Sequence, residues 1–162
     1  MQAFVFTVDG RRMAVPASLV SAVTPRVRTS PMLGAPPFVP GLMDLRGQLV
    51  PVVDASLLCG GPGVPGTIGA RIVVLEVPVA PEPGAPAAVR RLGLLVERVL
   101  DREELSVGAE AWHPGAMAAS LPFLGAVGRA ERGEAQLLDA AALLRHARLL
   151  GPGTQQAVER IP

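Results

Sequence analysis

The chain has 162 residues, of which 49% are hydrophobic, and a formal net charge of +1 at pH 7. Fifteen arginines nearly balance fourteen acidic residues, which excludes the strongly basic surface of a nucleic-acid-binding protein. No segment approaches the roughly 18 uninterrupted apolar residues of a membrane helix, so we expect no direct membrane insertion.

The N-terminus and the single cysteine bear on localisation and on redox chemistry. Residues 1–6 begin directly in a strand pattern, without the basic segment and cleavage site of a secretion signal, so we expect a cytoplasmic protein. Cys59 has no second cysteine with which to form an intrachain disulfide or a multi-thiolate metal site. We expect it to be a small buried apolar residue rather than a reactive thiol.

A β-hairpin is predicted at the start of the chain. Residues 3–8 and 11–15 are rich in apolar side chains and flank Asp9-Gly10, a dipeptide typical of a two-residue hairpin turn. Large apolar side chains occupy every second position of the first strand from Phe4 onward. This alternation predicts that one face of the strand is packed into a core.

A short helix, a strand and a loop are predicted to follow. Pro16 is favourable in the first turn of a helix, which we expect over residues 17–22. A strand is predicted over residues 23–27. Residues 30–37 contain three prolines and a glycine, so we expect a loop there.

The most informative stretch runs from Phe38 to Asp54 and is interpreted as two short strands that meet at Arg46-Gly47-Gln48. Gly47 can adopt the positive φ that a tight connection demands. Pro51 has no N–H to donate, so the second strand either lies at a sheet edge or turns Pro51 away from its partner. Arg46 has two interpretations, a solvated turn residue or an interface arginine whose planar head contacts another protein.

The middle of the chain is predicted to contain a helical turn and a buried strand between loops. Asp54 can cap a single helical turn over residues 54–58. Glycine- and proline-rich loops are predicted at 60–69 and 78–86. Between them, residues 70–77 form a near-continuous apolar run, which is typical of a strand buried on both faces.

The third quarter of the chain continues in strands. An apolar strand is predicted over residues 89–100, and the acidic pair Glu103-Glu104 beyond it is expected to be solvated. Residues 111–120 are irregular. A final hairpin is predicted from residues 123–129 and 135–138.

The chain is predicted to end in a helix over residues 139–149, followed by a loose tail at 151–162. Apolar positions with helical spacing form one stripe, which consists of Ala140, Leu143, Leu144 and Ala147. Basic positions occupy the other face and suit a helix C-terminus; they are Arg145, His146 and Arg148.

One pattern occurs twice in the sequence. A glycine, an Arg-Gly turn, an apolar strand, an Asp-Ala pair and two leucines follow one another from Gly41 and again from Gly125. Two similar small barrels, each ending in a helical turn, would leave such a repeat. A chance match of common turn residues is the alternative.

The sequence contains no catalytic constellation. His113 and His146 each lack a metal-ligand partner at useful spacing, and we interpret His113 as a loop residue. No serine occupies a Gly-x-Ser-x-Gly elbow, and the absence of lysine excludes a Walker-type phosphate loop and a Schiff base. We therefore expect neither a cofactor nor an enzymatic activity.

The stretch Gly41-Leu42-Met43-Asp44-Leu45-Arg46-Gly47-Gln48-Leu49-Val50-Pro51-Val52-Val53-Asp54 resembles the signature of CheW-like domains, the adaptors of bacterial chemosensory arrays. The resemblance covers nearly the whole chain, since the Asp9-Gly10 hairpin, the strand at 95–99 and the run Leu137-Leu138-Asp139 are also similar to family features. Three positions depart from the family pattern and bear on partner choice: Ala22, Asp44 and Glu97.

The resemblance implies a mainly β fold of two intertwined five-stranded barrels with short helices, a single domain over residues 1–162, and a hydrophobic groove between the barrels. It also implies a non-catalytic adaptor that couples the regulatory domain of a CheA-type histidine kinase to the signalling tip of methyl-accepting chemoreceptors. The expected partner-binding residues are Val39, Leu42, Asp44, Arg46, Gly47 and Val50. The apolar ones are candidates for the groove, although burial in the core is the default for such residues on strands. The alternative is a small-ligand-binding or enzymatic β-barrel that uses the groove as a pocket.

Overall fold

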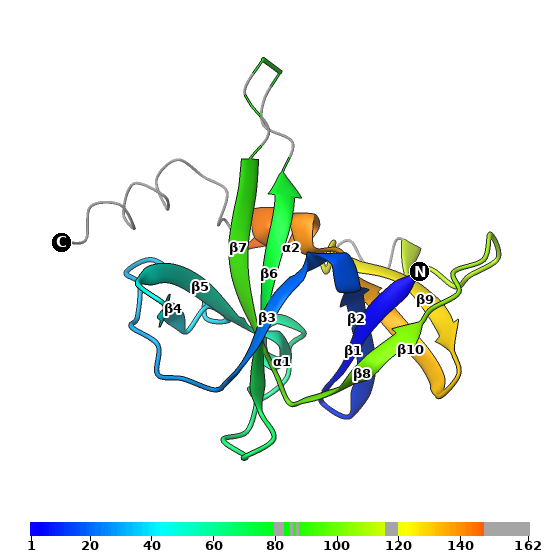
Figure 1. Ribbon diagram of the computed structural model, residues 1–162, viewed down its shortest axis with the longest axis horizontal. Coiled ribbons are helices and arrows are strands. Elements are labelled where there is room, and N and C mark those ends of the chain that lie inside the picture. Colours follow the sequence, from blue (N-terminus) through cyan, green and yellow to red (C-terminus); the bar gives the residue numbers. More distant parts are fainter. Residues whose placement is uncertain (80–82, 85, 87, 116–119, 148–162) are drawn as a thin grey trace.

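The computed structural model describes residues 1–79, 83–84, 86, 88–115 and 120–147, and its fold is mainly β (Figure 1). The strands form two mixed five-stranded sheets, in the orders β8-β1-β2-β10-β9 and β3-β6-β7-β5-β4. The first sheet consists of β1 (Gln2–Val8), β2 (Arg11–Pro16), β8 (Arg98–Glu104), β9 (Leu124–Ala130) and β10 (Gly133–Leu138). The second consists of β3 (Val20–Pro25), β4 (Gly41–Leu45), β5 (Gln48–Asp54), β6 (Arg71–Val79) and β7 (Ala88–Val96). The helices are η1 (Ala17–Leu19), α1 (Ala55–Leu58) and α2 (Ala140–His146). The expected fold class is confirmed.

Both sheets have the same topology. In each sheet an antiparallel hairpin, β1–β2 or β6–β7, lies beside a second hairpin, β9–β10 or β4–β5, and the inner strands of the two hairpins pair in parallel. A helix directly follows each second hairpin, α2 after β10 and α1 after β5. Each sheet takes strands from both halves of the chain, because β1 and β2 join β8, β9 and β10, whereas β6 and β7 join β3, β4 and β5. The two sheets are therefore intertwined.

The repeat extends to individual hydrogen bonds. Asp54 and Asp139 each cap the helix that follows, because a side-chain oxygen accepts the N–H of the residue three positions later, at 3.1 and 3.0 Å. Their own N–H groups donate to the carbonyl oxygens of Phe38 and Phe123, at 2.8 and 2.7 Å. These matched contacts favour an internal duplication over a chance match of turn residues.

Each sheet curls until one bridge joins its two edges. Ser30, which follows β3, exchanges two backbone hydrogen bonds of 2.8 Å with Leu42 of β4. Ser106, which follows β8, exchanges hydrogen bonds of 2.8 and 2.9 Å with Arg129 of β9. Bridging the edges satisfies backbone groups that an open sheet would expose. The sheets therefore approach the two barrels that the resemblance implies.

The alternation of side chains along the strands divides the buried residues between the barrel interiors and a core that the two sheets share. On β6, Ile72 and Val74 pack inside the second barrel, whereas Val73 and Leu75 pack in the shared core. Burial on both faces explains the near-continuous apolar run that was predicted here. The shared core also receives the apolar face of α2, so that it holds both sheets together.

The prediction that one face of β1 is packed into a core is confirmed, and the other face is buried as well. Phe6 and Val8 do face the shared core, but Ala3 and Val5 on the same strand fill the interior of the first barrel. The ladder between β1 and β8 shifts its register between Val5 and Phe6, because β8 has an extra residue there, Leu100. Closure of the sheet into a barrel creates the second buried face, which simple alternation did not indicate.

The predicted helix over residues 17–22 is wrong in its second half. Only η1 is helical, and the chain is extended from Val20 onward. Val20 lies opposite Leu75 in the ladder between β3 and β6, so long-range pairing overrides the local helical preference. The same ladder ends at Pro25, two residues before the end of the strand predicted over 23–27.

The single strand predicted over residues 89–100 is two strands in different sheets. β7 ends at Val96 and β8 begins at Arg98, with Glu97 between them. The N–H of Glu97 donates to the carbonyl of Thr7 at 3.1 Å, and the Thr7 hydroxyl donates to the Glu97 carboxylate at 3.2 Å. These contacts hold the chain at the point where it passes from one barrel to the other.

Glu103, which was expected to be solvated, and His146, which was predicted on the basic face of the last helix, are both packed against other side chains. Glu103 lies opposite Ala3 on the inward face of the first barrel, where it forms an ion pair with Arg12. His146 of α2 is half-buried, stacked on Phe38 at 5.6 Å between ring centroids and edge-on to Phe123 at 5.3 Å. Tertiary contacts therefore decide the environment of both side chains.

The predicted turns and the terminal helix are otherwise confirmed. Asp9 and Gly10 form the first hairpin turn, with positive φ at both residues. The apolar stripe of α2 is buried, and Arg145 is exposed. Arg148, Leu149 and the tail at 151–162 lie outside the described residues. In the part of the chain that the structure describes, no helix has the length and apolar character needed to cross a membrane.

Candidate interaction surface

The β4–β5 turn places the polar residues of the motif at the surface. Arg46 and Gly47 are its two central residues, and their φ angles are 53° and 83°, as in a type I′ hairpin turn. Asp44 stabilises this geometry, because its Oδ1 accepts a hydrogen bond from the N–H of Gly47 at 2.7 Å. The sequence indicated a positive φ for Gly47 but not for Arg46, where the left-handed conformation costs about 1–2 kcal/mol.

Pro51 is accommodated without an edge strand. β5 lies inside its sheet, between β4 and β7, and its parallel ladder with β7 begins at Val52. In a ladder closed by a two-residue turn, Leu42 and Pro51 form a non-hydrogen-bonded pair, so the β4–β5 ladder needs no N–H from Pro51. The β5–β7 ladder begins only after Pro51, so it is not interrupted either. Of the two predicted solutions, the structure adopts the one in which proline turns away from its partner.

The six predicted partner-binding residues fall into two groups. The apolar group is buried and consists of Val39, Leu42 and Val50. The polar group is exposed and consists of Asp44, Arg46 and Gly47. Val39 packs in the shared core and Val50 inside the second barrel. In this conformation only the exposed group offers atoms to a partner.

Leu49 adds an apolar contact that the sequence reasoning missed. It lies opposite Asp44 in the β4–β5 ladder and is 40% exposed. The available signal was the alternation along β5, which places Leu49 outside the barrel once Val50 is inside. We term Asp44, Arg46, Gly47 and Leu49 the turn surface. Among the described residues Arg46 has no hydrogen-bond or ion-pair partner, so its donors face solvent.

The space between the barrels is largely filled by the shared core rather than open as a groove. Beside this core the surface is hollowed by a cavity of about 400 Å³, which we term the inter-barrel cavity. The ends of β2 and β6, together with β9, β10 and the start of α2, line it, and Leu19 and Val77 are among its apolar residues. The motif residues Val39, Leu42 and Val50 are not part of this lining.

The described residues do not assemble a metal site, because no three His, Cys, Asp or Glu side chains among them are grouped to hold an ion. His113 is an exposed loop residue whose Nδ1 accepts a hydrogen bond from the N–H of Gly115 at 3.3 Å. Cys59 is half-buried rather than fully buried, and its burial raises the pKa of the thiol, with a further rise from nearby Asp9 and an opposing effect of Arg11. A raised pKa keeps the thiol protonated and poorly nucleophilic near neutral pH.

These features define a class of protein: a mainly β fold of two intertwined barrels with an exposed hairpin turn between β4 and β5. A family model for the CheW-like domain matches residues 2–148, so the chain belongs to the CheW-like domain family. Its fold is similar to a crystal structure described as the scaffolding protein TtCheW from Thermoanaerobacter tengcongensis. That comparison has a TM-score of 0.65 and 18% sequence identity, and covers 85% of this chain and 87% of the other. No curated protein matches the chain at a significant level.

Proposed function

We propose that this protein is a non-catalytic, cytoplasmic adaptor that couples the regulatory domain of a CheA-type histidine kinase to the signalling tip of methyl-accepting chemoreceptors. Membership of the CheW-like family supports a role in chemotaxis signalling. The structural neighbour is described as a scaffolding protein, which agrees with an adaptor. The contribution of both halves of the chain to each sheet supports a further proposal, that residues 1–162 act as one domain.

The observation that carries the proposal is the turn surface. A guanidinium without a partner among the described residues lies on a fixed turn beside an exposed leucine. Arginine is enriched in protein interfaces and is among the commonest binding hot spots. A fixed turn loses little conformational entropy when it binds, so that its contacts contribute fully to affinity.

The experiment is to measure the affinity of the protein for an isolated receptor signalling tip and for the kinase regulatory domain. We expect Arg46→Ala to weaken at least one of these complexes by about 1–3 kcal/mol while changing the stability of the protein by no more than about 0.5 kcal/mol. Arg46→Lys is expected to restore part of the affinity, because an ammonium keeps the charge but loses the planar fork.

Arg28→Ala is the matched control, since Arg28 is an exposed arginine in the connection after β3, outside the turn surface. It is expected to bind both partners as the wild type does. If Arg46→Ala binds both partners with unchanged affinity, Arg46 is a solvated turn residue and not part of the interface. If the wild type binds neither partner, the adaptor proposal itself fails.

A further inference from the structure

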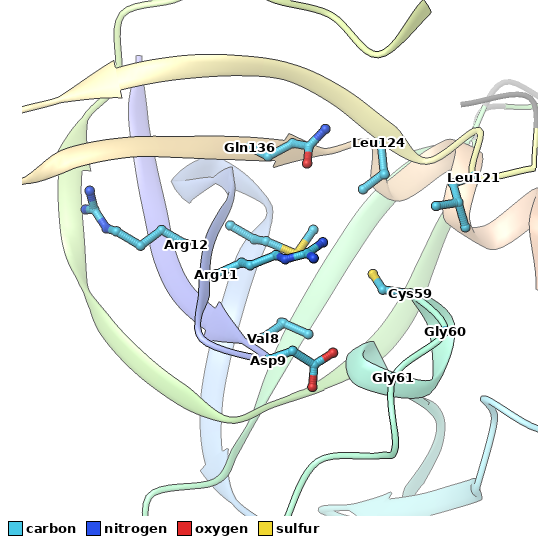
Figure 2. Close-up of a pocket in the computed structure, with 11 residues that line it drawn as sticks. Val8, Asp9, Arg11, Arg12, Cys59, Gly60, Gly61, Leu121, Leu124 and Gln136 are labelled. Carbon is cyan, nitrogen blue, oxygen red and sulfur yellow. The ribbon is translucent and has the colours of Figure 1, made fainter. Parts of the chain in front are cut away.

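Another cavity lies where the first hairpin approaches the loop that follows α1 (Figure 2). It has a volume of about 240 Å³ and is lined by the β1–β2 turn, the loop after α1, the segment leading into β9, and β10. We term it the hairpin cavity. Both halves of the repeat contribute to it, whereas no residue of the turn surface or of the inter-barrel cavity lining does so.

One wall of the hairpin cavity is fixed by a chain of hydrogen bonds that joins the β1–β2 turn to α1 and the loop after it. The hydroxyl of Ser56 on α1 donates to Asp9 Oδ1 at 2.8 Å and accepts the N–H of Gly63 at 3.0 Å. Gly61 packs so closely against this pair that a Cβ there would lie 2.4 Å from Asp9 Oδ2. The wall is therefore preformed, which reduces the entropy lost when a ligand binds.

Two arginines are among the described residues that line the cavity, and Arg11 is the one without an ion pair there. Arg11 extends across it toward Cys59, whereas the neighbouring Arg12 points away (Figure 2). Arg12 is engaged in its ion pair with Glu103 inside the first barrel. Arg11 has neither a hydrogen bond nor an ion pair among the described residues, although its charge acts on the thiol of Cys59. Its five N–H donors can bind a carboxylate through two parallel hydrogen bonds.

Apolar side chains share the rest of the lining with Asp9 and Gln136. Val8 and Met13 form part of the buried shared core, and the partly buried Leu121 and Leu124 pack against the same core. The carboxylate of Asp9 accepts the hydrogen bond of Ser56 through Oδ1. A ligand held against Arg11 would thus meet a cation and hydrocarbon, with Asp9 on the wall beside Ser56. Inorganic phosphate would use only the cation, and a neutral alcohol only the hydrocarbon.

We propose that the hairpin cavity binds a small carboxylate with a short apolar body, held by Arg11 through its carboxylate and by the apolar lining through its hydrocarbon. The volume is below the roughly 300 Å³ at which drug-sized pockets begin, which restricts the ligand to a few carbon atoms. A ligand of about eight non-hydrogen atoms is expected to have a Kd of about 1 mM. This site is independent of the adaptor role, since it uses different residues.

The test uses Cys59 as a reporter, because it is the only cysteine in the chain and lines the cavity. The rate at which the intact protein reacts with a disulfide thiol reagent is measured against increasing hexanoate or benzoate. We expect a saturable slowing, since the bound carboxylate covers the thiol and adds negative charge beside it. In ¹⁵N NMR spectra, the amide signals of Cys59 and Gly61 are expected to shift with the same Kd.

Variants and analogues separate the two contacts. Arg11→Gln is expected to weaken hexanoate binding about tenfold or more, because one charge-assisted contact is lost, whereas Arg28→Gln has no effect. Hexanol and inorganic phosphate are expected to protect Cys59 with Kd values at least about tenfold higher than that of hexanoate. Arg11 is exposed, so a melting curve should show that Arg11→Gln is folded.

The proposal is overturned if hexanoate and benzoate give no saturable effect at about ten times the expected Kd. It is also overturned if hexanol or phosphate protects equally, or if Arg11→Gln binds as the wild type does. All of these titrations use the protein alone. Their outcome is therefore distinguishable from that of the kinase and receptor measurements, which test the turn surface.

Discussion

At the scale of single residues, Arg46 is unusual because it adopts a conformation that favours glycine or asparagine. Its φ of 53° lies in the left-handed region. Asp44 stabilises the turn, because its Oδ1 accepts a hydrogen bond from the N–H of Gly47. A residue better suited to this backbone would make the turn more stable. That an arginine stands here suggests that its side chain is used, which agrees with the proposed contact.

We predict that Arg46→Asn separates turn stability from partner binding. Asparagine tolerates the left-handed conformation, and Asn-Gly is a favoured type I′ dipeptide, so the free energy of unfolding should rise by about 0.5–1 kcal/mol. The same variant lacks the guanidinium and should bind the partners as weakly as Arg46→Ala does. Urea denaturation and the affinity measurements check the two parts. A less stable Arg46→Asn protein would contradict the assignment of the turn.

The thiol of Cys59 offers a test of local electrostatics. Burial raises its pKa above the ordinary value of 9.0, and Arg11 partly opposes this rise. The folded protein therefore holds this proton to higher pH than the unfolded chain does. The contribution of the protonated thiol to the free energy of unfolding is fully present below pH 9.0 and is lost as pH rises through the pKa of the thiol in the folded protein. We predict a pH–rate profile for thiol labelling with its midpoint above 9.0.

Arg11→Gln should move that midpoint further up, because the charge that favours the thiolate is removed. Arg28→Gln serves as the control and should leave it in place. A wild-type midpoint at or below 9.0 would contradict the burial of the thiol.

At the scale of the elements, closure of the second barrel depends on a close approach at Gly41. A Cβ at this position would lie 2.0 Å from the carbonyl oxygen of Ser30, and the φ of Gly41 is 147°. Ser30 is the residue that bridges to Leu42 and joins the two edges of the sheet. The glycine that opens the family motif is therefore explained by barrel closure rather than by partner binding.

We predict that Gly41→Ala destabilises the protein by about 2–4 kcal/mol, because backbone strain and a steric clash coincide. Gly34→Ala is the matched control. Gly34 has a φ of 80° with no atom within 4 Å of its Cβ position, so only the strain applies, and the cost should be about 1 kcal/mol. The free energies of unfolding are compared by urea denaturation. Equal costs for the two variants would show that the bridge is dispensable.

Helix α2 is the element whose apolar face completes the shared core. Leu144 is 1% exposed within this core. We predict that Leu144→Asp lowers the stability by about 4 kcal/mol or more, since an unpaired carboxylate would be buried. Arg145→Asp, at an exposed position on the same helix, should cost no more than about 1 kcal/mol. Thermal melts of both variants make the comparison, and an unchanged melting temperature for Leu144→Asp would contradict the packing of α2.

At the scale of the whole molecule, each barrel is incomplete without the other half of the chain. The first sheet combines β1 and β2 with β8, β9 and β10, and the second combines β6 and β7 with β3, β4 and β5. The largest buried cluster also contains residues from both sheets and from α2. The two barrels are therefore expected to fold and unfold together.

We predict a single cooperative unfolding transition in urea, with circular dichroism and Trp112 fluorescence giving the same midpoint. A fragment of residues 1–69 should remain unfolded, because it lacks the strands that pair with β1, β2 and β3 in the complete sheets. Two separate transitions, or a folded fragment with a cooperative melt, would show that the barrels are autonomous.

The sequence by itself determined the features that depend on neighbours in the chain. The Asp9-Gly10 turn, the Asp54 cap, the strand at Ile72–Leu75 and the Arg46-Gly47 turn were all predicted because turn chemistry, capping and short-range alternation act within a few residues. The tertiary structure alone decided which sheet each strand joins and which side of it is buried. The break at Glu97, the extended chain from Val20 and the burial of Glu103 all result from pairing between distant segments. For the same reason Val39, Leu42 and Val50 of the predicted site are buried, whereas Leu49 is at the surface. Barrel closure decides which face of each strand lies inside, and no local sequence pattern contains that information.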